Sequence, residues 1–276
     1  MQPELTQKQE TLFSMLRDMD RVIVAFSGGT DSAYLAWAAH HVLGDRSLAV
    51  TADSASIPES HKRDAEDFVR QFGLRHEYIE TFEFDNPDYV RNNPDRCFHC
   101  KDELFTRLAG LCRERGILNV VYGVNVDDTS DFRPGQRAAS EHGVRAPLLD
   151  AGMTKAEIRE LSREAGLPTW DRPASACLSS RIPYGTAVTT ENVKVVEKGE
   201  EAIKALGFRQ FRVRYHEELV RIEIAPEELE RALNIETARK LTSIFKWLGF
   251  KFVTLDLEGY RQGALNEVLT VLKKSS

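Results

Sequence analysis

The sequence predicts an α/β protein, in which a doubly wound parallel sheet is followed by a smaller C-terminal α+β domain. Three observations support this prediction. Short strand-like runs alternate with helical patterns in the first part of the chain, a glycine pair follows the first apolar run, and the pattern changes after Gly185. Strands that alternate with helices favour parallel pairing and right-handed crossovers. We therefore expect two domains, 1–185 and 186–276.

The elements of the first domain follow from hydrophobic periodicity. Short runs bounded by polar residues are typical of strands in a parallel sheet, and helical spacing of apolar residues predicts helices around them. The expected strands are 22–26, 48–52, 75–80 and 119–125, and the expected helices are 4–19, 31–42, 59–72, 102–115 and 154–165. Thr154 and Glu157 have the spacing of a capping box, which marks the start of the last helix.

The segment after Gly185 has a different pattern. Two alternating strands, 211–215 and 219–224, are separated by a short turn and predict an antiparallel hairpin. Helices are expected at 190–206, 226–233 and 235–248, and a last strand at 251–257. Strands with polar outer faces and helices gathered to one side indicate an α+β domain.

Composition excludes several classes of protein. The chain has 276 residues, of which 42% are hydrophobic and 29% are charged, as in globular proteins. No apolar run approaches the length of a membrane span, and the N-terminus lacks the apolar core of a signal peptide, so we expect a cytoplasmic protein with no membrane partner. A formal net charge of −6 does not favour a large nucleic-acid surface.

The turn after the first expected strand is the most informative stretch of the chain. It has the sequence Ser-Gly-Gly-Thr-Asp-Ser over residues 27–32. Adjacent glycines allow backbone N–H groups to turn toward one point, and the following helix N-terminus adds free donors and partial positive charge. Such a turn suits phosphate or pyrophosphate. The alternative is an ordinary strand-to-helix turn in which Ser27 or Asp31 caps the helix.

Three further residues bear on a nucleotide site here. Asp31 would repel phosphate, but it suits a Mg²⁺ ion that the phosphates share. Ser54 follows the second expected strand, and the carboxyl ends of parallel strands line the ligand crevice; a simple turn serine is the alternative. Gly123 lies in the fourth expected strand, where it permits close approach of a flat group or only packs on a neighbour.

Four cysteines in a chain of this length do not form a disulfide framework. Cys97 and Cys100 have the CxxC spacing, which brings two thiolates to one metal or cluster edge; a redox pair or buried thiols are the alternatives. Cys112 lies in an expected helix and fits an apolar filler. Cys177 lies in a loop beside Arg181, which would stabilise its thiolate; a buried, inert cysteine is the alternative.

Arginines are the remaining candidates for binding anions. Arg212 and Arg214 are two residues apart in an expected strand, so they share one face and could hold one phosphate group. Arg133 and Arg137 lie in a segment that could close over the nucleotide site and are candidate clamps. For each of these residues, the alternative is ordinary surface charge.

The string Ser-Gly-Gly-Thr-Asp-Ser after an apolar strand resembles the PP-loop of the ATP pyrophosphatase superfamily, which has an adenine nucleotide alpha hydrolase-like fold. A Walker-type GxxxxGK[ST] motif, typical of kinases and GTPases, is absent from the sequence. Together with the Arg-Pro-Gly loop, the Ser-Ser-Arg-Ile-Pro-Tyr-Gly run and the closing Val-Thr-Leu-Asp-Leu strand, this string makes nearly the whole chain similar to the LarE family.

The resemblance implies an ATP-dependent sulfur transferase of nickel-pincer nucleotide cofactor synthesis. Its substrate would be the small-molecule nucleotide pyridinium-3,5-biscarboxylic acid mononucleotide, whose carboxylates are adenylated and then converted to thiocarboxylates. The implied cofactors are ATP, Mg²⁺ and a 4Fe–4S cluster, with a sulfide or persulfide donor as a further partner. We also expect a homo-oligomer.

The resemblance also assigns residues. The implied ATP-binding residues are Ala25, Phe26, Ser27, Gly28, Gly29, Thr30, Asp31, Ser32, Ser54 and Gly123, with Mg²⁺ on Asp31. The implied substrate-binding residues are Ser180, Arg181, Arg212 and Arg214, and Glu200 and Glu223 are candidates for a second metal. The implied catalytic residues are Asp31 and the three cysteines Cys97, Cys100 and Cys177, which would hold the cluster.

Two sulfur sources are known in this family. In one branch a single cysteine is sacrificed and becomes dehydroalanine; that cysteine corresponds to Ala176 here, and the branch lacks the CxxC motif. The present chain matches the branch with three cysteines, although Cys177 is displaced by one residue and could itself be sacrificed. The glycine turn is also compatible with a PP-loop tRNA thiolase, an amide-forming synthetase or a nucleotide-binding module without catalysis.

Overall fold

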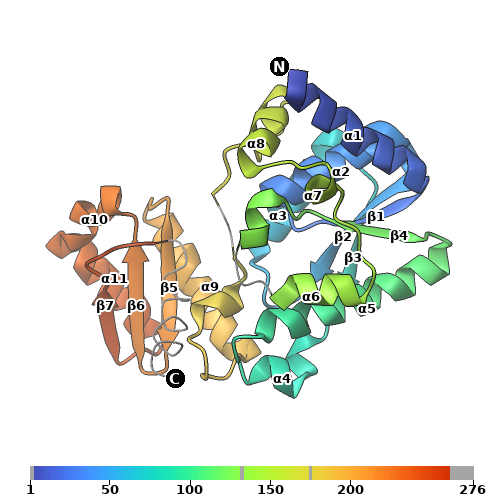
Figure 1. Cartoon of the computed structure of the whole chain (residues 1–276). Coiled ribbons are helices and arrows are strands. Elements are labelled where there is room, and N and C mark those ends of the chain that lie inside the picture. The colour runs from blue at the N-terminus through green and yellow to red at the C-terminus, as the bar shows by residue number, and fades with distance from the viewer. Residues whose placement is uncertain (1–2, 131–133, 174–175, 262–276) are drawn as a thin grey trace. The chain divides into compact units, whose positions relative to one another are not determined.

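The structure is a computed structural model that describes residues 3–130, 134–173 and 176–261. The chain forms two compact units, each described by itself below (Figure 1). The first unit comprises Met1–Glu83 and Asp95–Ser175, and the second comprises Phe84–Pro94 and Ala176–Ser276. The second unit therefore includes a short segment, Phe84–Pro94, that comes before the CxxC motif and is flanked on both sides by residues of the first unit. The boundary at residue 185 stays a prediction.

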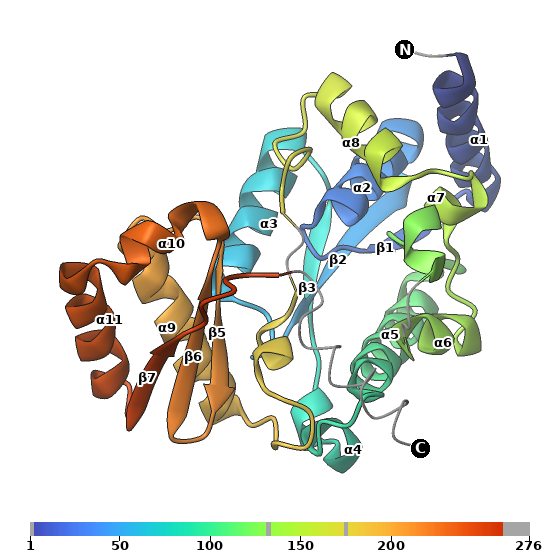
Figure 2. The ribbon, with the colours of Figure 1, turned by 60° about the vertical axis from the view of Figure 1, so that its left-hand side comes forward.

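Among the described residues of the first unit, four parallel strands form a sheet in the order β3-β2-β1-β4. Figure 2 labels β1, β2 and β3 of this sheet. The strands are β1 (Val22–Ala25), β2 (Ser47–Asp53), β3 (His76–Glu80) and β4 (Asn119–Tyr122). Strand β1 pairs with β2 on one side and with β4 on the other, so the direction of winding reverses at β1. In such sheets ligands bind beyond the carboxyl end of the strand at the reversal. The predicted doubly wound sheet is confirmed.

Helices cover both faces of this sheet. The helices and 3₁₀ turns of the first unit, with the small part of the second unit between them, are α1 (Pro3–Met19), α2 (Thr30–Leu43), η1 (Gly44–Arg46), α3 (Glu59–Phe72), η2 (Glu83–Asp85), α4 (Pro87–Val90), α5 (Arg96–Arg115), η3 (Val126–Ser130), α6 (Pro134–Glu141), α7 (Pro147–Asp150) and α8 (Lys155–Glu164). Thr154 caps α8 through the predicted capping box with Glu157.

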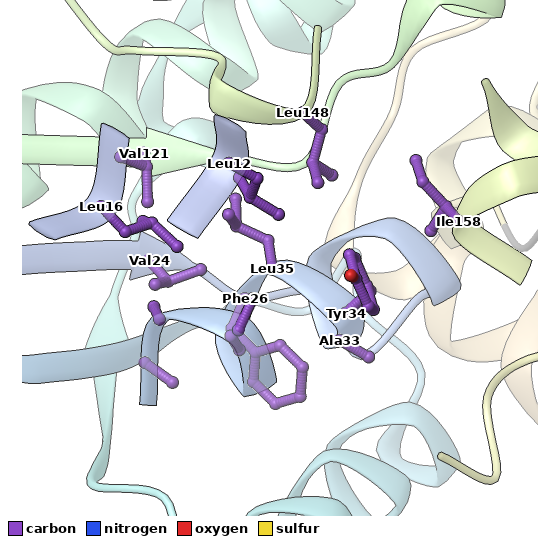
Figure 3. Packing of buried hydrophobic residues seen from close by; sticks show 14 of the residues in the cluster. Leu12, Leu16, Val24, Phe26, Ala33, Tyr34, Leu35, Val121, Leu148 and Ile158 are labelled. Atoms are coloured by element: carbon purple, nitrogen blue, oxygen red, sulfur yellow. The ribbon is translucent and has the colours of Figure 1, made fainter. Parts of the chain in front are cut away.

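Alternation of side chains along β1 divides the core of the first unit into two layers. Val24 belongs to one cluster with Leu12 and Leu16 of α1 and Leu35 of α2 (Figure 3). Ile23 points to the opposite face, where its cluster includes residues of α5 and α6. Because successive strand residues face opposite sides, an unbroken apolar strand needs cover on both.

The second unit contains a three-stranded sheet in the order β5-β6-β7 within its described residues. Its remaining elements are η4 (Leu178–Arg181), α9 (Thr190–Ala205), β5 (Phe211–His216), β6 (Leu219–Ile224), α10 (Pro226–Leu233), α11 (Ile235–Trp247) and β7 (Phe252–Leu255). Strands β5 and β6 are antiparallel, and β7 runs parallel to β6. Gly199 lets α9 approach α11, because a Cβ there would lie 2.6 Å from the ring of Phe245. The predicted small sheet with helices is present.

Two expected boundaries in the first unit are wrong. The fourth strand, expected over 119–125, ends at Tyr122. Helix α5 begins at Arg96, so Cys97 and Cys100 lie in its first turns and not in a loop before residue 102. The polar run before the motif suggested a loop, but tertiary packing extends the helix: the guanidinium of Arg137 on α6 lies 3.9 Å from the ring centre of Phe98. Among the described residues, no helix combines the length and apolar character needed to cross a bilayer.

Candidate functional site: a phosphate cradle and a cluster of arginines

The turn from β1 to α2 leaves backbone donors free. Gly28 adopts φ +72°, the left-handed region that favours glycine, and Gly29 precedes the helix without a side-chain cap. Within the described residues, the N–H groups of Gly28, Gly29 and Thr30 donate to no protein acceptor. Free N–H groups at a glycine turn and a helix N-terminus form a binding site for anionic oxygens. The geometry is that of a phosphate cradle.

Two serines brace this turn. The backbone N–H of Ser27 donates to Oγ of Ser32 over 3.2 Å, and the two hydroxyls lie 3.0 Å apart. Ser32 Oγ in turn donates to the carbonyl of Gly29 over 3.1 Å. At the strand end, Phe26 is tied to β2, because its carbonyl accepts from Thr51 Oγ1 over 2.9 Å. The predicted residues from Ala25 to Ser32 thus form the end of β1, the glycine turn and the first residues of α2, and hydrogen bonds of Ser27, Ser32 and Phe26 hold this segment together.

Asp31 lies in the first turn of α2 and has two partners from elsewhere in the first unit. Its Oδ2 accepts from the ammonium of Lys155 over 2.6 Å, and its Oδ1 accepts from Asn125 Nδ2 over 3.3 Å. Sequence reasoning missed Lys155, which lies 124 positions away. The capping box places Lys155 at the start of α8, but no local motif relates it to Asp31. A carboxylate beside a cation and an amide suits a divalent ion shared with phosphates.

Arg172 supports the turn by binding a backbone carbonyl group of the turn. Its Nη1 donates to the carbonyl of Gly28 over 2.7 Å, and its Nη2 forms an ion pair with Asp64 of α3. Burial lowers the pKa of Arg172 from its ordinary value. Sequence reasoning missed Arg172 as well, because no local motif relates it to a turn 144 residues earlier.

Ser54 is buried at the carboxyl end of β2, in a cluster with Ser56 and Glu83. Ser54 Oγ donates to Glu83 Oε1, and Ser56 Oγ donates to the same oxygen over 3.1 Å. Glu83 is only 1% exposed, and its Oε2 has no partner among the described residues. Glu83 was missed by sequence reasoning. The position of Ser54 at the sheet edge agrees with the predicted crevice, and its contact with adenosine stays a prediction.

Gly123 has a packing role at the same edge. A Cβ on Gly123 would lie 2.7 Å from the backbone N of Ser32 and 2.9 Å from the carbonyl carbon of Asp31. Only glycine therefore allows the chain after β4 to pass against the first turn of α2. This is the second of the two roles that the sequence left open; contact with the nucleotide stays a prediction.

The three candidate cysteines are divided between the units. Cys97 and Cys100 lie on α5 of the first unit and Cys177 precedes η4 of the second, and none of them is in a disulfide. Cys112 is buried, as expected for an apolar filler, and burial raises the pKa of its thiol. In the part of the chain that the structure describes, no three His, Cys, Asp or Glu side chains converge on a metal position. The thiols fit an iron–sulfur cluster in type, and the assembly of Cys97, Cys100 and Cys177 into one site stays a prediction.

The predicted substrate-binding arginines lie together in the second unit. Arg181 is 2% exposed and forms a two-pronged pair with Glu200, through Nε at 2.9 Å and Nη2 at 3.1 Å. Its Nη1 donates to Ser180 Oγ over 2.9 Å and to the carbonyl of Cys177 over 3.0 Å. The loop that carries Cys177 is therefore held by a buried guanidinium.

A second pair extends this cluster across the β5–β6 hairpin. Arg214 donates through Nε and Nη2 to the two oxygens of Glu223, each over 2.8 Å, and through Nη1 to the carbonyl of Ser180 over 3.0 Å. Arg212 lies with its guanidinium 4.8 Å from the ring centre of Tyr260. Burial, and then the charge of Arg181, lower the pKa of Arg212. Glu200 and Glu223 thus pair with arginines, and their role as ligands of a second metal stays a prediction.

The two candidate clamps from the 131–139 segment have different outcomes. Arg133 lies outside the described residues. Arg137 is stacked on Phe98 and lies 3.4 Å from Glu141, so its guanidinium is engaged on the surface of α5 and α6. Its role as a phosphate clamp stays a prediction.

Comparison with known proteins identifies the family. A family model for NAD synthase matches residues 10–125. Over 270 residues, 96% of each chain, the protein is 37% identical to pyridinium-3,5-bisthiocarboxylic acid mononucleotide synthase of Lactiplantibacillus plantarum. The chain belongs to the LarE family. LarE proteins are ATP-dependent enzymes of the PP-loop type, so the predicted superfamily and its use of ATP are confirmed.

Two further relatives of this LarE-family chain have no assigned activity. An uncharacterized protein of Synechocystis is 42% identical over 266 residues, which cover 96% of this chain and 99% of the relative. An uncharacterized protein of Methanocaldococcus jannaschii is 28% identical over 241 residues, which cover 87% of this chain and 91% of the relative. Similarity to the Synechocystis and Lactiplantibacillus plantarum relatives extends over both units, so the arginine cluster lies within the shared part of the chain.

Proposed function

We propose that the protein adenylates the carboxylates of pyridinium-3,5-biscarboxylic acid mononucleotide and converts them to thiocarboxylates for nickel-pincer nucleotide synthesis. The observation that carries this proposal is the set of free N–H groups of Gly28, Gly29 and Thr30 beside Asp31. Membership in the LarE family supports a sulfur transferase of this pathway, and the name of the Lactiplantibacillus plantarum relative supports the bisthiocarboxylic product.

The first proposed step is transfer of AMP to the substrate. A carboxylate oxygen attacks the α-phosphorus of ATP, a new P–O bond forms, the bond to the β-phosphate oxygen breaks, and pyrophosphate leaves with the electron pair. The free N–H groups of the cradle stabilise the charge on the leaving group. Asp31 would hold the Mg²⁺ that the phosphates share. The ammonium of Lys155, released from Asp31 when the metal binds, would then neutralise phosphate charge.

The second proposed step replaces oxygen by sulfur. A hydrosulfide attacks the acyl carbon, a C–S bond forms, the C–O bond breaks, AMP leaves with the electron pair, and the thiol proton passes to solvent. Cys97, Cys100 and Cys177 would together hold a 4Fe–4S cluster, which when bound supplies an iron with an open position for the transferable sulfur. A sulfide or persulfide donor would restore it.

The second unit is proposed to bind the substrate. Ser180, Arg181, Arg212 and Arg214 supply donors for its phosphate and carboxylate groups, and guanidinium groups match both by two-pronged hydrogen bonding. Glu200 and Glu223 would hold two of these guanidinium groups until the substrate arrives, or a second metal once it has. The homo-oligomeric state and the cytoplasmic location remain predictions.

Iron analysis after purification without oxygen tests the sulfur site. We expect a brown protein with about four irons per chain, and we expect Cys97→Ala to lose that iron. Cys112→Ala is the matched control, because this buried cysteine lies on the same helix outside the motif. A colourless protein that accumulates dehydroalanine at position 177 would overturn the cluster and support a sacrificial cysteine.

Pyrophosphate release tests the adenylation step. Mixing the protein with Mg-ATP and the biscarboxylic nucleotide should release pyrophosphate, whereas Mg-ATP alone should release little. A nucleotide-binding module without catalysis would release none in either mixture. Release with a glutamine- or tRNA-dependent acceptor, and none with the nucleotide, would instead favour an amide-forming synthetase or a tRNA thiolase.

A further inference from the structure

The hydrogen bond from Arg172 to Gly28 fixes the orientation of a peptide group in the phosphate cradle. A peptide unit is planar and trans, so its carbonyl and the N–H of the next residue point in opposite directions. Because the carbonyl of Gly28 faces Arg172 at 2.7 Å, the N–H of Gly29 points away from Arg172. That N–H is one of the free donors of the cradle.

Glycine makes this fixation necessary. Gly28 has φ +72°, and a glycine turn without a Cβ has more accessible conformations than any other backbone. A Cβ on Gly28 would make ordinary van der Waals contact with Ala65 at 3.6 Å, but glycine has no such group, so no side-chain contact of Gly28 itself holds the peptide in one orientation. A specific hydrogen bond has to do so, and a charged donor makes the stronger kind.

Arg172 is itself held on several sides. Asp64 on α3 pairs with its Nη2, and Arg159 on α8 donates to its backbone carbonyl over 3.1 Å. Three residues earlier, the carbonyl of Thr169 accepts from Thr30 Oγ1 over 2.8 Å. The segment 169–172 is thus bonded to both ends of the Gly28–Thr30 turn, and the guanidinium is oriented before any ligand binds.

We propose that Arg172 is a positioning residue for ATP: it holds the Gly28 carbonyl so that the cradle presents its N–H groups to the phosphates, with Asp64 orienting the guanidinium. The proposal rests on the proposed function only in taking the ligand to be the triphosphate and pyrophosphate of ATP. It predicts that loss of Arg172 weakens binding of the phosphate chain and leaves binding of the nucleoside unchanged.

Calorimetry with pyrophosphate, Mg-ATP and adenosine tests this directly. Arg172→Met should weaken pyrophosphate and Mg-ATP at least about tenfold, which corresponds to the loss of one charge-assisted hydrogen bond. Adenosine affinity should stay within about twofold. Arg172→Lys retains a charged donor that can reach the Gly28 carbonyl, so it should recover most of the phosphate affinity. Recovery should be incomplete, because an ammonium lacks the planar set of donors with which a guanidinium binds two partners.

Asp64→Asn supplies the second arm, with Asp67→Asn as its matched control. Asp67 lies on the same helix and forms a surface pair with Arg70 at 3.4 Å. Asp64→Asn should weaken pyrophosphate about threefold, since the guanidinium keeps its bond to Gly28 but loses its orienting charge; Asp67→Asn should match the unmodified protein.

Two outcomes would overturn the proposal. One is an unchanged pyrophosphate affinity in Arg172→Met. The other is an equal loss for adenosine and pyrophosphate, which would mean that Arg172 only maintains the fold. If Arg172→Met does not fold, Arg172→Lys and Asp64→Asn allow the same two comparisons: pyrophosphate affinity against that of the unmodified protein, and the loss for pyrophosphate against the loss for adenosine. All of these measurements use only ATP and its fragments, so they stand even if the sulfur acceptor differs from the one proposed.

Discussion

The two units are prepared for anions in opposite ways. In the first unit, the donors of the cradle are backbone N–H groups that lack a partner in the described part of the chain. In the second unit, Arg181 and Arg214 are buried and already paired with Glu200 and Glu223. A ligand of the cradle adds hydrogen bonds to free groups, whereas a ligand of the arginines has to compete with carboxylates.

Because of this difference, the groups proposed to bind a ligand contribute little to stability in the first unit but contribute strongly to it in the second. Free N–H groups at a glycine turn do little to hold the fold together, so the cradle is available for a ligand at low cost. A buried charge without its partner is strongly unfavourable. The guanidinium groups that we propose to bind the substrate therefore also stabilise the second unit.

The largest expected effect comes from breaking a buried pair. Glu223→Met leaves Arg214, which is 6% exposed, with the carbonyl of Ser180 and no carboxylate. Removing one partner of a buried ion pair costs about 3–5 kcal/mol. We expect the free energy of unfolding of the second unit, measured in urea, to fall by that amount.

A crossed control sharpens this result. Asp31→Asn removes the partner of Lys155, whose side chain is 33% exposed, so stability should change by less than about 1 kcal/mol. ATP-dependent pyrophosphate release should nevertheless fall at least about 100-fold, as expected for a group that acts on transition-state charge. The double variant Arg214→Met/Glu223→Met should recover most of the lost stability. Equal destabilisation by Glu223→Met and Asp31→Asn would contradict the comparison.

The cradle could be predicted from the sequence because it is local. The Ser-Gly-Gly-Thr-Asp-Ser string between an apolar strand and a helix specifies a backbone geometry, and backbone N–H groups need no distant partner. The start of α8 was predicted for the same reason, since a capping box involves residues only three positions apart. The boundaries of the first three strands were likewise within one residue of those observed, whereas the fourth strand ends three residues earlier than expected.

The groups around the cradle could not be predicted in this way. Lys155 and Arg172 reach Asp31 and Gly28 across 124 and 144 positions, and no periodicity encodes such a pairing. The start of α5 was missed because Phe98 is stabilised by Arg137 of α6, a tertiary contact. The arginines of the second unit were found as candidate ligands, but their pairing with glutamates depends on tertiary structure: Arg181 of η4 meets Glu200 of α9, and Arg214 meets Glu223 across two strands.

Gly123→Ala is expected to have an intermediate effect, and it tests whether the cradle depends on packing below it. The new Cβ would meet the backbone at Ser32 and Asp31 at under 3 Å, so the start of α2 has to move. Overpacking of this kind costs about 1–3 kcal/mol. Affinity for Mg-ATP should fall with stability, while properties of the second unit should not change.

Gly110→Ala is the control for Gly123→Ala. Gly110 lies inside α5, and the nearest atom to a Cβ placed there belongs to a flexible arginine side chain at 3.9 Å. Alanine in a helix interior is favoured over glycine by about 0.5–1 kcal/mol. Stability should therefore stay equal or rise, and Mg-ATP affinity should not change. A loss of affinity in Gly110→Ala would show that any disturbance of the first unit affects the cradle.

The smallest expected effect is a pH dependence that each unit derives from one histidine. His76 contacts Thr51 Oγ1 at 2.8 Å below the cradle, and burial lowers its pKa from the ordinary value near 6.5. In the second unit, burial and then Arg221 and Arg214 lower the pKa of His216. Each folded-state pKa is below the unfolded value, so the unfolded chain binds more protons than the folded chain at a pH between the two values. Stability therefore falls as pH drops below about 6.5.

Urea unfolding between about pH 7.5 and 5 should show this loss of stability in both units. His76→Gln should flatten it in the first unit alone and His216→Gln in the second, whereas an unchanged slope in both variants would assign the loss to carboxylates.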